Sequence, residues 1–130
     1  MKMQVFKTLT GAKLLSVLLV VFSVQLTDPA SANSIRNFNL TAELWARPRS
    51  GAVIPQMEPL KLAVSYWATG SDAMIMLSYP GEDSGEIWAA ELKDWLISLG
   101  IPSEFILLSP GFQVEDEIRI LVGSRQELLK

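Results

Sequence analysis

Hydrophobic positions along residues 38–122 change spacing several times, and each change predicts a new element. Residues 38–45 (FNLTAELW) alternate apolar and polar side chains, which is typical of a half-buried strand. Residues 57–68 place their apolar side chains on one side of a helix of about three turns, and Pro59 fits its first turn. The stretch between them, residues 46–56, contains Pro and Gly and predicts a loop.

Three more strands are predicted further along the chain. Residues 73–79 (AMIMLSY) are apolar at nearly every position, as in a strand from the middle of a sheet. Residues 104–109 and 117–122 predict two further strands. The polar tail from Gly123 onward is expected to fray, unless Leu128 and Leu129 dock on the domain.

The best-defined element is a helix over residues 84–99. Asp83 and Glu86 have the spacing of a capping box, and Gly100 stands where the end of a helix needs a left-handed residue. Its apolar stripe comprises Trp88, Leu92, Trp95, Leu96 and Leu99. Because Leu92 and Trp95 centre this stripe, we expect them to be among the most deeply buried side chains.

The predicted order is therefore β-α-β-α-β-β. Strand–helix–strand connections are right-handed, so the strands that they join should run parallel. We expect a two-layer α+β domain, a small mixed sheet with two helices on one face, whose core covers about residues 35–123.

The N-terminus has the features of a signal peptide. Three lysines precede residues 14–26, an uncharged apolar run that is too short to span a bilayer but suits the core of a signal. Ala30-Ser31-Ala32 is a small-x-small site, which predicts cleavage after Ala32 and a single domain over residues 33–130. The alternative is an uncleaved membrane anchor. We expect an exported protein, periplasmic or secreted, with no membrane span after cleavage.

Composition narrows the chemistry. The chain contains no Cys and no His, which excludes disulfides, thiolate zinc sites, thiol nucleophiles and imidazole bases. We therefore expect a protein that is not an enzyme and has no cofactor. Residues 33–130 carry eight basic and thirteen acidic side chains, a formal charge of −5. That balance argues against nucleic acid as a partner.

One segment resembles a known family. Residues 94–106 (DWLISLGIPSEFI) are similar to the second helix and third strand of the OmpA-like domain, in which a leucine-rich helix end is followed by Gly-Ile-Pro and a strand beginning with Ile. This is the periplasmic, peptidoglycan-binding domain of outer-membrane protein A and of flagellar motor proteins. The order of elements over residues 38–122 agrees with it, so the resemblance implies an OmpA-like fold.

The family's ligand-binding residues are absent at the matching positions. OmpA-like domains hold diaminopimelate with an Asp just after the second strand and an Arg early in the second helix. Here Gly81 and Trp88 occupy those places, and Glu115-Asp116-Glu117 replace the basic residues before the last strand. The resemblance therefore implies a degenerate ligand site.

Two functions remain open from the sequence. The favoured one is a non-catalytic periplasmic interaction or scaffold domain whose partner is an envelope protein. The alternative is a cell-wall module with a rearranged site, although peptidoglycan is not the favoured partner. Glu82, Asp83 and Glu86 could bind calcium, but helix capping explains them more simply. The candidate interaction surface comprises Tyr79, Glu82, Asp83, Glu86 and Trp88.

Overall fold

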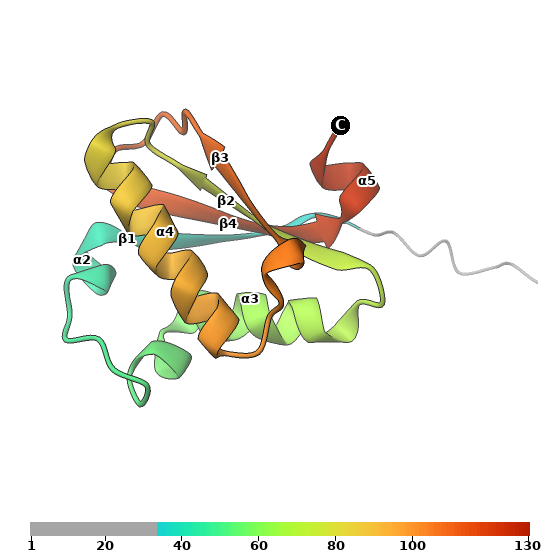
Figure 1. The fold of residues 1–130 in the computed structure, drawn as a ribbon, viewed down its shortest axis with the longest axis horizontal. Helices are drawn as coiled ribbons and strands as arrows, with labels where there is room; N and C mark the ends of the chain where they lie inside the picture. Colours follow the sequence, from blue (N-terminus) through green and yellow to red (C-terminus); the bar gives the residue numbers. More distant parts are fainter. Residues whose placement is uncertain (1–33) are drawn as a thin grey trace, which may run out of the picture. The chain divides into compact units, whose positions relative to one another are not determined.

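A four-stranded mixed sheet forms the centre of the computed structural model, which describes residues 34–130 (Figure 1). The strands are β1 (Arg36–Thr41), β2 (Ala73–Tyr79), β3 (Ile106–Pro110) and β4 (Glu117–Ser124), in the spatial order β1-β4-β2-β3. Strands β2 and β3 are parallel, whereas β4 is antiparallel to both of its neighbours. Strands β1 and β2 therefore run in the same direction, as predicted for strands joined through a helix.

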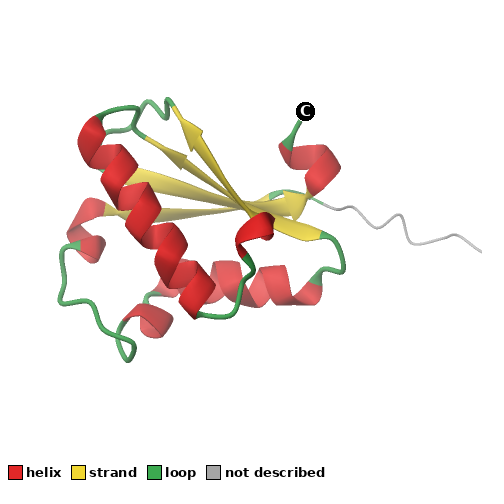
Figure 2. Ribbon diagram, viewed as in Figure 1, coloured by secondary structure: helices red, strands yellow, loops and turns green. Residues whose placement is uncertain are grey.

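Two long helices cover one face of this sheet (Figure 2). Helix α3 (Glu58–Thr69) packs against β1, β4 and β2, and helix α4 (Asp83–Ser98) packs against β2 and β3. The shorter elements are α2 (Ala42–Trp45), the 3₁₀ turns η1 (Ile54–Gln56) and η2 (Ser103–Phe105), and α5 (Arg125–Leu128). This arrangement confirms the predicted two-layer α+β domain.

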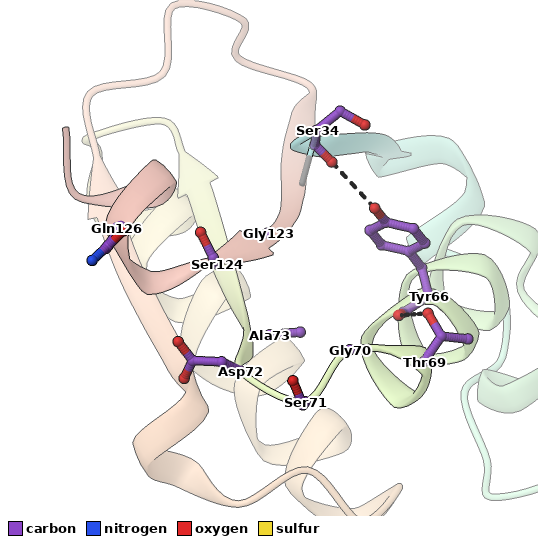
Figure 3. A pocket seen from close by; sticks show the side chains of 10 residues that line it. All are labelled: Ser34, Tyr66, Thr69, Gly70, Ser71, Asp72, Ala73, Gly123, Ser124 and Gln126. Carbon is purple, nitrogen blue, oxygen red and sulfur yellow. Dashed lines mark hydrogen bonds between the residues drawn. The ribbon is translucent and has the colours of Figure 1, made fainter. Parts of the chain in front are cut away.

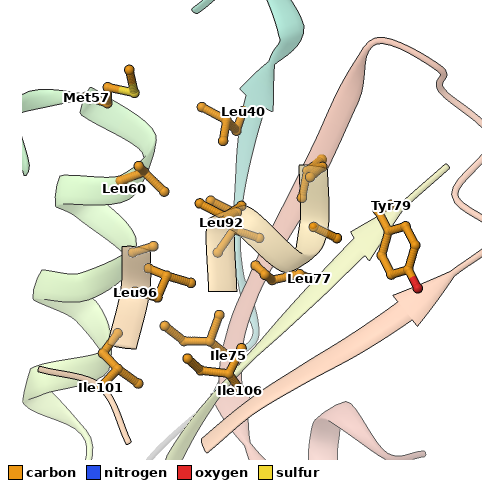
Figure 4. Close-up of a cluster of buried hydrophobic side chains, with 14 of the residues drawn as sticks. Leu40, Met57, Leu60, Ile75, Leu77, Tyr79, Leu92, Leu96, Ile101 and Ile106 are labelled. Atoms are coloured by element: carbon orange, nitrogen blue, oxygen red, sulfur yellow. The ribbon is translucent and has the colours of Figure 1, made fainter. Parts of the chain in front are cut away.

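The hydrophobic core lies between the sheet and the two helices (Figure 4). Successive side chains of a strand point to opposite faces of the sheet, and paired residues on neighbouring strands share a face. Every second residue of each strand therefore points toward the helices. The fully buried side chains of this layer include Leu40, Leu60, Ile75, Leu77, Leu92, Leu96, Ile118, Ile120 and Val122. Without disulfides, this layer supplies most of the stability of the domain.

Helix α4 approaches the sheet through a different stripe from the predicted one. Its buried residues are Gly85, Ala89, Leu92 and Leu96. A Cβ on Gly85 would collide with the backbone carbonyl of Pro80, so glycine permits the close approach. The burial predicted for Leu92 is confirmed. The burial predicted for Trp95 is wrong, because the small residues set the line of contact and leave the indole half-buried on one flank.

At its N-terminus α4 differs from the prediction, whereas at its C-terminus it agrees with it. The predicted capping box at Asp83 is wrong, because Glu82 is the N-cap residue and no side chain caps the helix there. Gly100 does adopt the left-handed conformation, with φ of 103°. Asp83 is already the first helical residue, where its carboxylate still favours the positive end of the helix dipole.

The first strand is shorter than its alternating pattern predicts. It ends at Thr41, whose hydroxyl accepts a hydrogen bond from the Leu44 backbone N–H at 3.2 Å. This cap starts the single turn of α2, which carries Trp45 into the core. The strand predicted over residues 42–45 is therefore wrong.

The chain after β4 is ordered, contrary to the expected fraying. Ser124 and Glu127 form a capping box, in which the Ser124 hydroxyl accepts from the Glu127 N–H at 3.4 Å. The third strand also starts later than predicted, because η2 occupies Ser103–Phe105.

The predicted signal peptide and its cleavage site lie outside the described residues. Among the helices of residues 34–130, none is both long enough and apolar enough to cross a membrane.

Candidate functional site

The sheet has a second face, opposite α3 and α4, on which two contrasting rows of side chains cross the strands. Asn37, Leu121, Met76 and Leu107 form the first row by strand register. Asn39, Arg119, Ser78 and Ser109 form the second. The three apolar members of the first row are half-buried. An apolar row thus lies beside a polar row that contains one cation, and we call these two rows the open sheet face.

Helix α5 covers only one end of this face. Met74 lies on the same side by its pairing with Gly123, yet it is 1% exposed. A Cβ on Gly123 would lie 3.5 Å from the Glu127 carboxylate, which places α5 over this row. Figure 1 shows α5 at the end of β4, away from α3 and α4. No other described helix packs against this side, so the apolar row stays open beyond Met74.

Arg119 supplies the positive charge of the open sheet face. Its guanidinium lies over the Phe112 ring, 4.6 Å from the ring centroid. Its Nε is buried and has no hydrogen-bond partner, and among residues 34–130 it forms no ion pair. Glu117 shares this side of β4 but does not reach it within salt-bridge distance. Arg119 is therefore held in place by Phe112 and carries a charge that no carboxylate of residues 34–130 pairs with.

The predicted interaction residues are divided between the surface and the interior. Glu82, Asp83 and Glu86 lie exposed around the start of α4. Tyr79 belongs to the core and is 7% exposed, and Trp88 is half-buried. The structure therefore does not bring all five side chains together on one open surface.

Trp88 instead belongs to a cluster that fastens the 46–56 loop to α4. Its ring stacks on Trp45 with centroids 6.4 Å apart. Arg49 lies over the Trp45 ring, donates to the Trp45 carbonyl at 2.6 Å and pairs with Glu91 at 3.0 Å. The Trp88 indole Nε1 is buried and has no hydrogen-bond partner. These contacts give the position a structural role that the sequence did not reveal.

A polar pocket of about 360 Å³ lies at the N-terminal end of β2, beside Ala73 (Figure 3). It forms where the turn between α3 and β2 faces the start of α5. The side chains that carry its chemistry are Tyr66, Thr69, Ser71, Asp72, Ser124 and Gln126. Residues 69–72 directly follow the helix predicted over residues 57–68, and no sequence pattern indicates that a distant C-terminal turn lies opposite them.

Metal binding was the other use considered for the acidic residues. Within residues 34–130, no three acidic side chains gather closely enough to hold a metal ion. Glu82, Asp83 and Glu86 do not form such a group, because their side chains spread around the exposed first turns of α4.

In comparisons with known proteins, no family model, no curated protein and no solved structure matches this chain.

Proposed function

We propose that this protein is an exported, non-catalytic interaction domain that docks an envelope protein through its open sheet face. The observation that carries the proposal is the uncovered row of Leu121, Met76 and Leu107. Adjacent apolar side chains left open on a folded domain are typical of an interaction site. The signal-like N-terminus supports export, and the charge of −5 argues against a nucleic acid or an anionic membrane as the partner.

Charge complementarity specifies the partner. A segment that covers the apolar row also covers the neighbouring Arg119, whose guanidinium has no ion-pair partner among residues 34–130. A carboxylate at that place would form a charge-assisted hydrogen bond and avoid burying an unpaired cation. The partner we infer is a protein segment with an apolar stripe flanked by an acidic side chain.

Site-specific photocrosslinking in the native host tests this proposal. A photoreactive residue at Leu107 should give one adduct whose partner is identified by mass spectrometry. Leu121→Lys should abolish this adduct, because it places a solvated charge in the apolar row. Ile87→Lys is the matched control, since Ile87 is 70% exposed on α4, away from the open sheet face. An adduct that survives Leu121→Lys, or no adduct at all, refutes the docking surface.

The alternative, a cell-wall module, is tested separately by peptidoglycan binding, which our proposal predicts to be absent. The purified domain should not bind diaminopimelate-type peptidoglycan, because Gly81 offers no carboxylate and Trp88 packs on Trp45 in place of a guanidinium. Each missing charge-assisted contact is worth about 1.5–3 kcal/mol, so two would weaken a micromolar site by roughly two to four powers of ten. Retention on sacculi that free diaminopimelate reverses would favour the alternative.

Export has its own measurement. The mature N-terminus should be Asn33, which intact mass or N-terminal sequencing of the exported protein determines. A product that keeps residues 14–26 and remains in the membrane fraction would instead show an uncleaved anchor.

A further inference from the structure

The polar pocket between α3 and α5 presents mainly hydrogen-bond acceptors. The Tyr66 hydroxyl donates to the Ser34 carbonyl at 3.2 Å, and the Thr69 hydroxyl donates to the Tyr66 carbonyl at 2.7 Å. The Ser124 hydroxyl lies 3.0 Å from the Glu127 carboxylate and donates to it. Because their protons are already used, these three hydroxyls retain only lone pairs for a ligand.

The charge of the pocket also favours a ligand that donates hydrogen bonds, because it is negative. Asp72 lines it with an exposed carboxylate that forms no ion pair among residues 34–130. No basic side chain lines the pocket. Arg36 lies over the Tyr66 ring at 5.4 Å, and Arg125 stands between the lining residues Ser124 and Gln126, yet neither forms an ion pair with Asp72. The carboxylate is thus available to an external donor.

Helix α3 adds a second, independent preference for positive charge. Its twelve residues end at Thr69, at the rim of the pocket, and the last turn contains no basic residue. The C-terminal end of a helix carries a partial negative charge that lysines and arginines commonly offset. The last turn of α3 supplies no such side chain, so the helix end favours positive charge on the Thr69 side of the pocket, and Asp72 favours it on the opposite side (Figure 3).

We infer that this pocket binds a primary alkylammonium group. Such a group offers three donors to a site that consists mostly of acceptors, and Ser71 and Gln126 can complete its shell. The volume of about 360 Å³ is at the small end for ligand pockets, which suits a short aliphatic amine. The ammonium can belong to a free diamine or to a lysine side chain. This site lies outside the two exposed rows of the open sheet face and does not depend on docking there.

Amide chemical shifts of the ¹⁵N-labelled exported protein test the inference. We expect 1,4-diaminobutane to produce saturable shifts at residues 70–73 and 123–126, whereas 1,4-butanediol, of the same length but uncharged, produces none. Nα-acetyl-lysine methylamide represents a protein lysine. Binding of the diamine alone assigns the site to a free amine, and tighter binding of the lysine derivative assigns it to a partner protein.

Two matched variants make the test specific. Asp72→Asn should weaken binding about tenfold or more, the loss expected when a charge-assisted hydrogen bond becomes a neutral one. Asp94→Asn causes the same change of net charge at an exposed position of α4, away from the pocket, and should leave binding unchanged. Asp72 is exposed and makes no hydrogen bond through its side chain among the described residues, so its replacement should keep the fold, which the spectrum checks directly. Equal binding of butanediol, equal loss in both variants, or no saturable shift overturns the inference.

Discussion

Leu92→Ala is the most informative test of the packing between α4 and the sheet. Leu92 is fully buried, so the substitution removes three carbon atoms from the core. At about 0.8 kcal/mol for each buried methylene, the transfer term alone is about 2.4 kcal/mol. The cavity left behind raises the expected loss of unfolding free energy to about 2–5 kcal/mol. A domain of this size has about 5–15 kcal/mol in total, so the variant should be visibly less stable.

Urea unfolding followed by tryptophan fluorescence measures this loss. All four tryptophans lie within the described residues and report on the core around α3 and α4. Ile87→Ala on the same helix is the matched control, and because Ile87 is 70% exposed, its replacement should cost less than about 1 kcal/mol. A loss below about 1 kcal/mol for Leu92→Ala, or equal losses in both variants, would mean that α4 does not face the sheet as described.

Three further substitutions test contacts that the sequence did not predict. Gly85→Ala should lower the free energy of unfolding by about 1–3 kcal/mol, because the added Cβ overpacks against the Pro80 carbonyl. Gly51→Ala is the control, since its Cβ would meet no atom within 4 Å, and it should not destabilise the domain in the same thermal unfolding measurement. Arg49→Gln removes the ion pair with Glu91 and the cation–π contact with Trp45, so urea unfolding should show a free energy of unfolding about 1 kcal/mol lower. An unchanged free energy would mean that other contacts hold the 46–56 loop. Ser124→Ala removes the cap of α5 and should cost about 1 kcal/mol while accelerating amide exchange in α5; unchanged exchange would contradict the capping box.

Local patterns predicted most elements of this fold because their causes are local. The central strand over residues 73–79 and the helix beginning near residue 57 agree with the structure, since an apolar run and an amphipathic spacing each impose one conformation. Gly100 adopts the predicted left-handed conformation for the same kind of reason. Two of the errors of backbone type arose where a short polar side chain competed with the pattern. Thr41 capped a helical turn inside an alternating run, and Ser124 capped one in a polar tail.

The candidate sites were less accessible to sequence reasoning. Arg119 lies within the strand predicted over residues 117–122, but its neighbours Asn39 and Ser78 come from strands about 80 and 40 positions earlier. Glu82, Asp83 and Glu86 stand out in the sequence because they lie within five positions, yet the structure places them on an exposed helix start. Proximity along the chain is thus a poor guide to which side chains form a surface.

The sequence by itself determined the order of the four strands and two long helices, the apolar faces of the strands, and the absence of cysteine and histidine chemistry, because each follows from residue type and short-range spacing. Only the tertiary structure decided which face of the sheet stayed open and which residues of α4 touch the core. It also decided that Asp72 shares a pocket with Gln126. The physical reason is that strand register and the closest approach between helix and sheet depend on side-chain volumes from distant segments packed together.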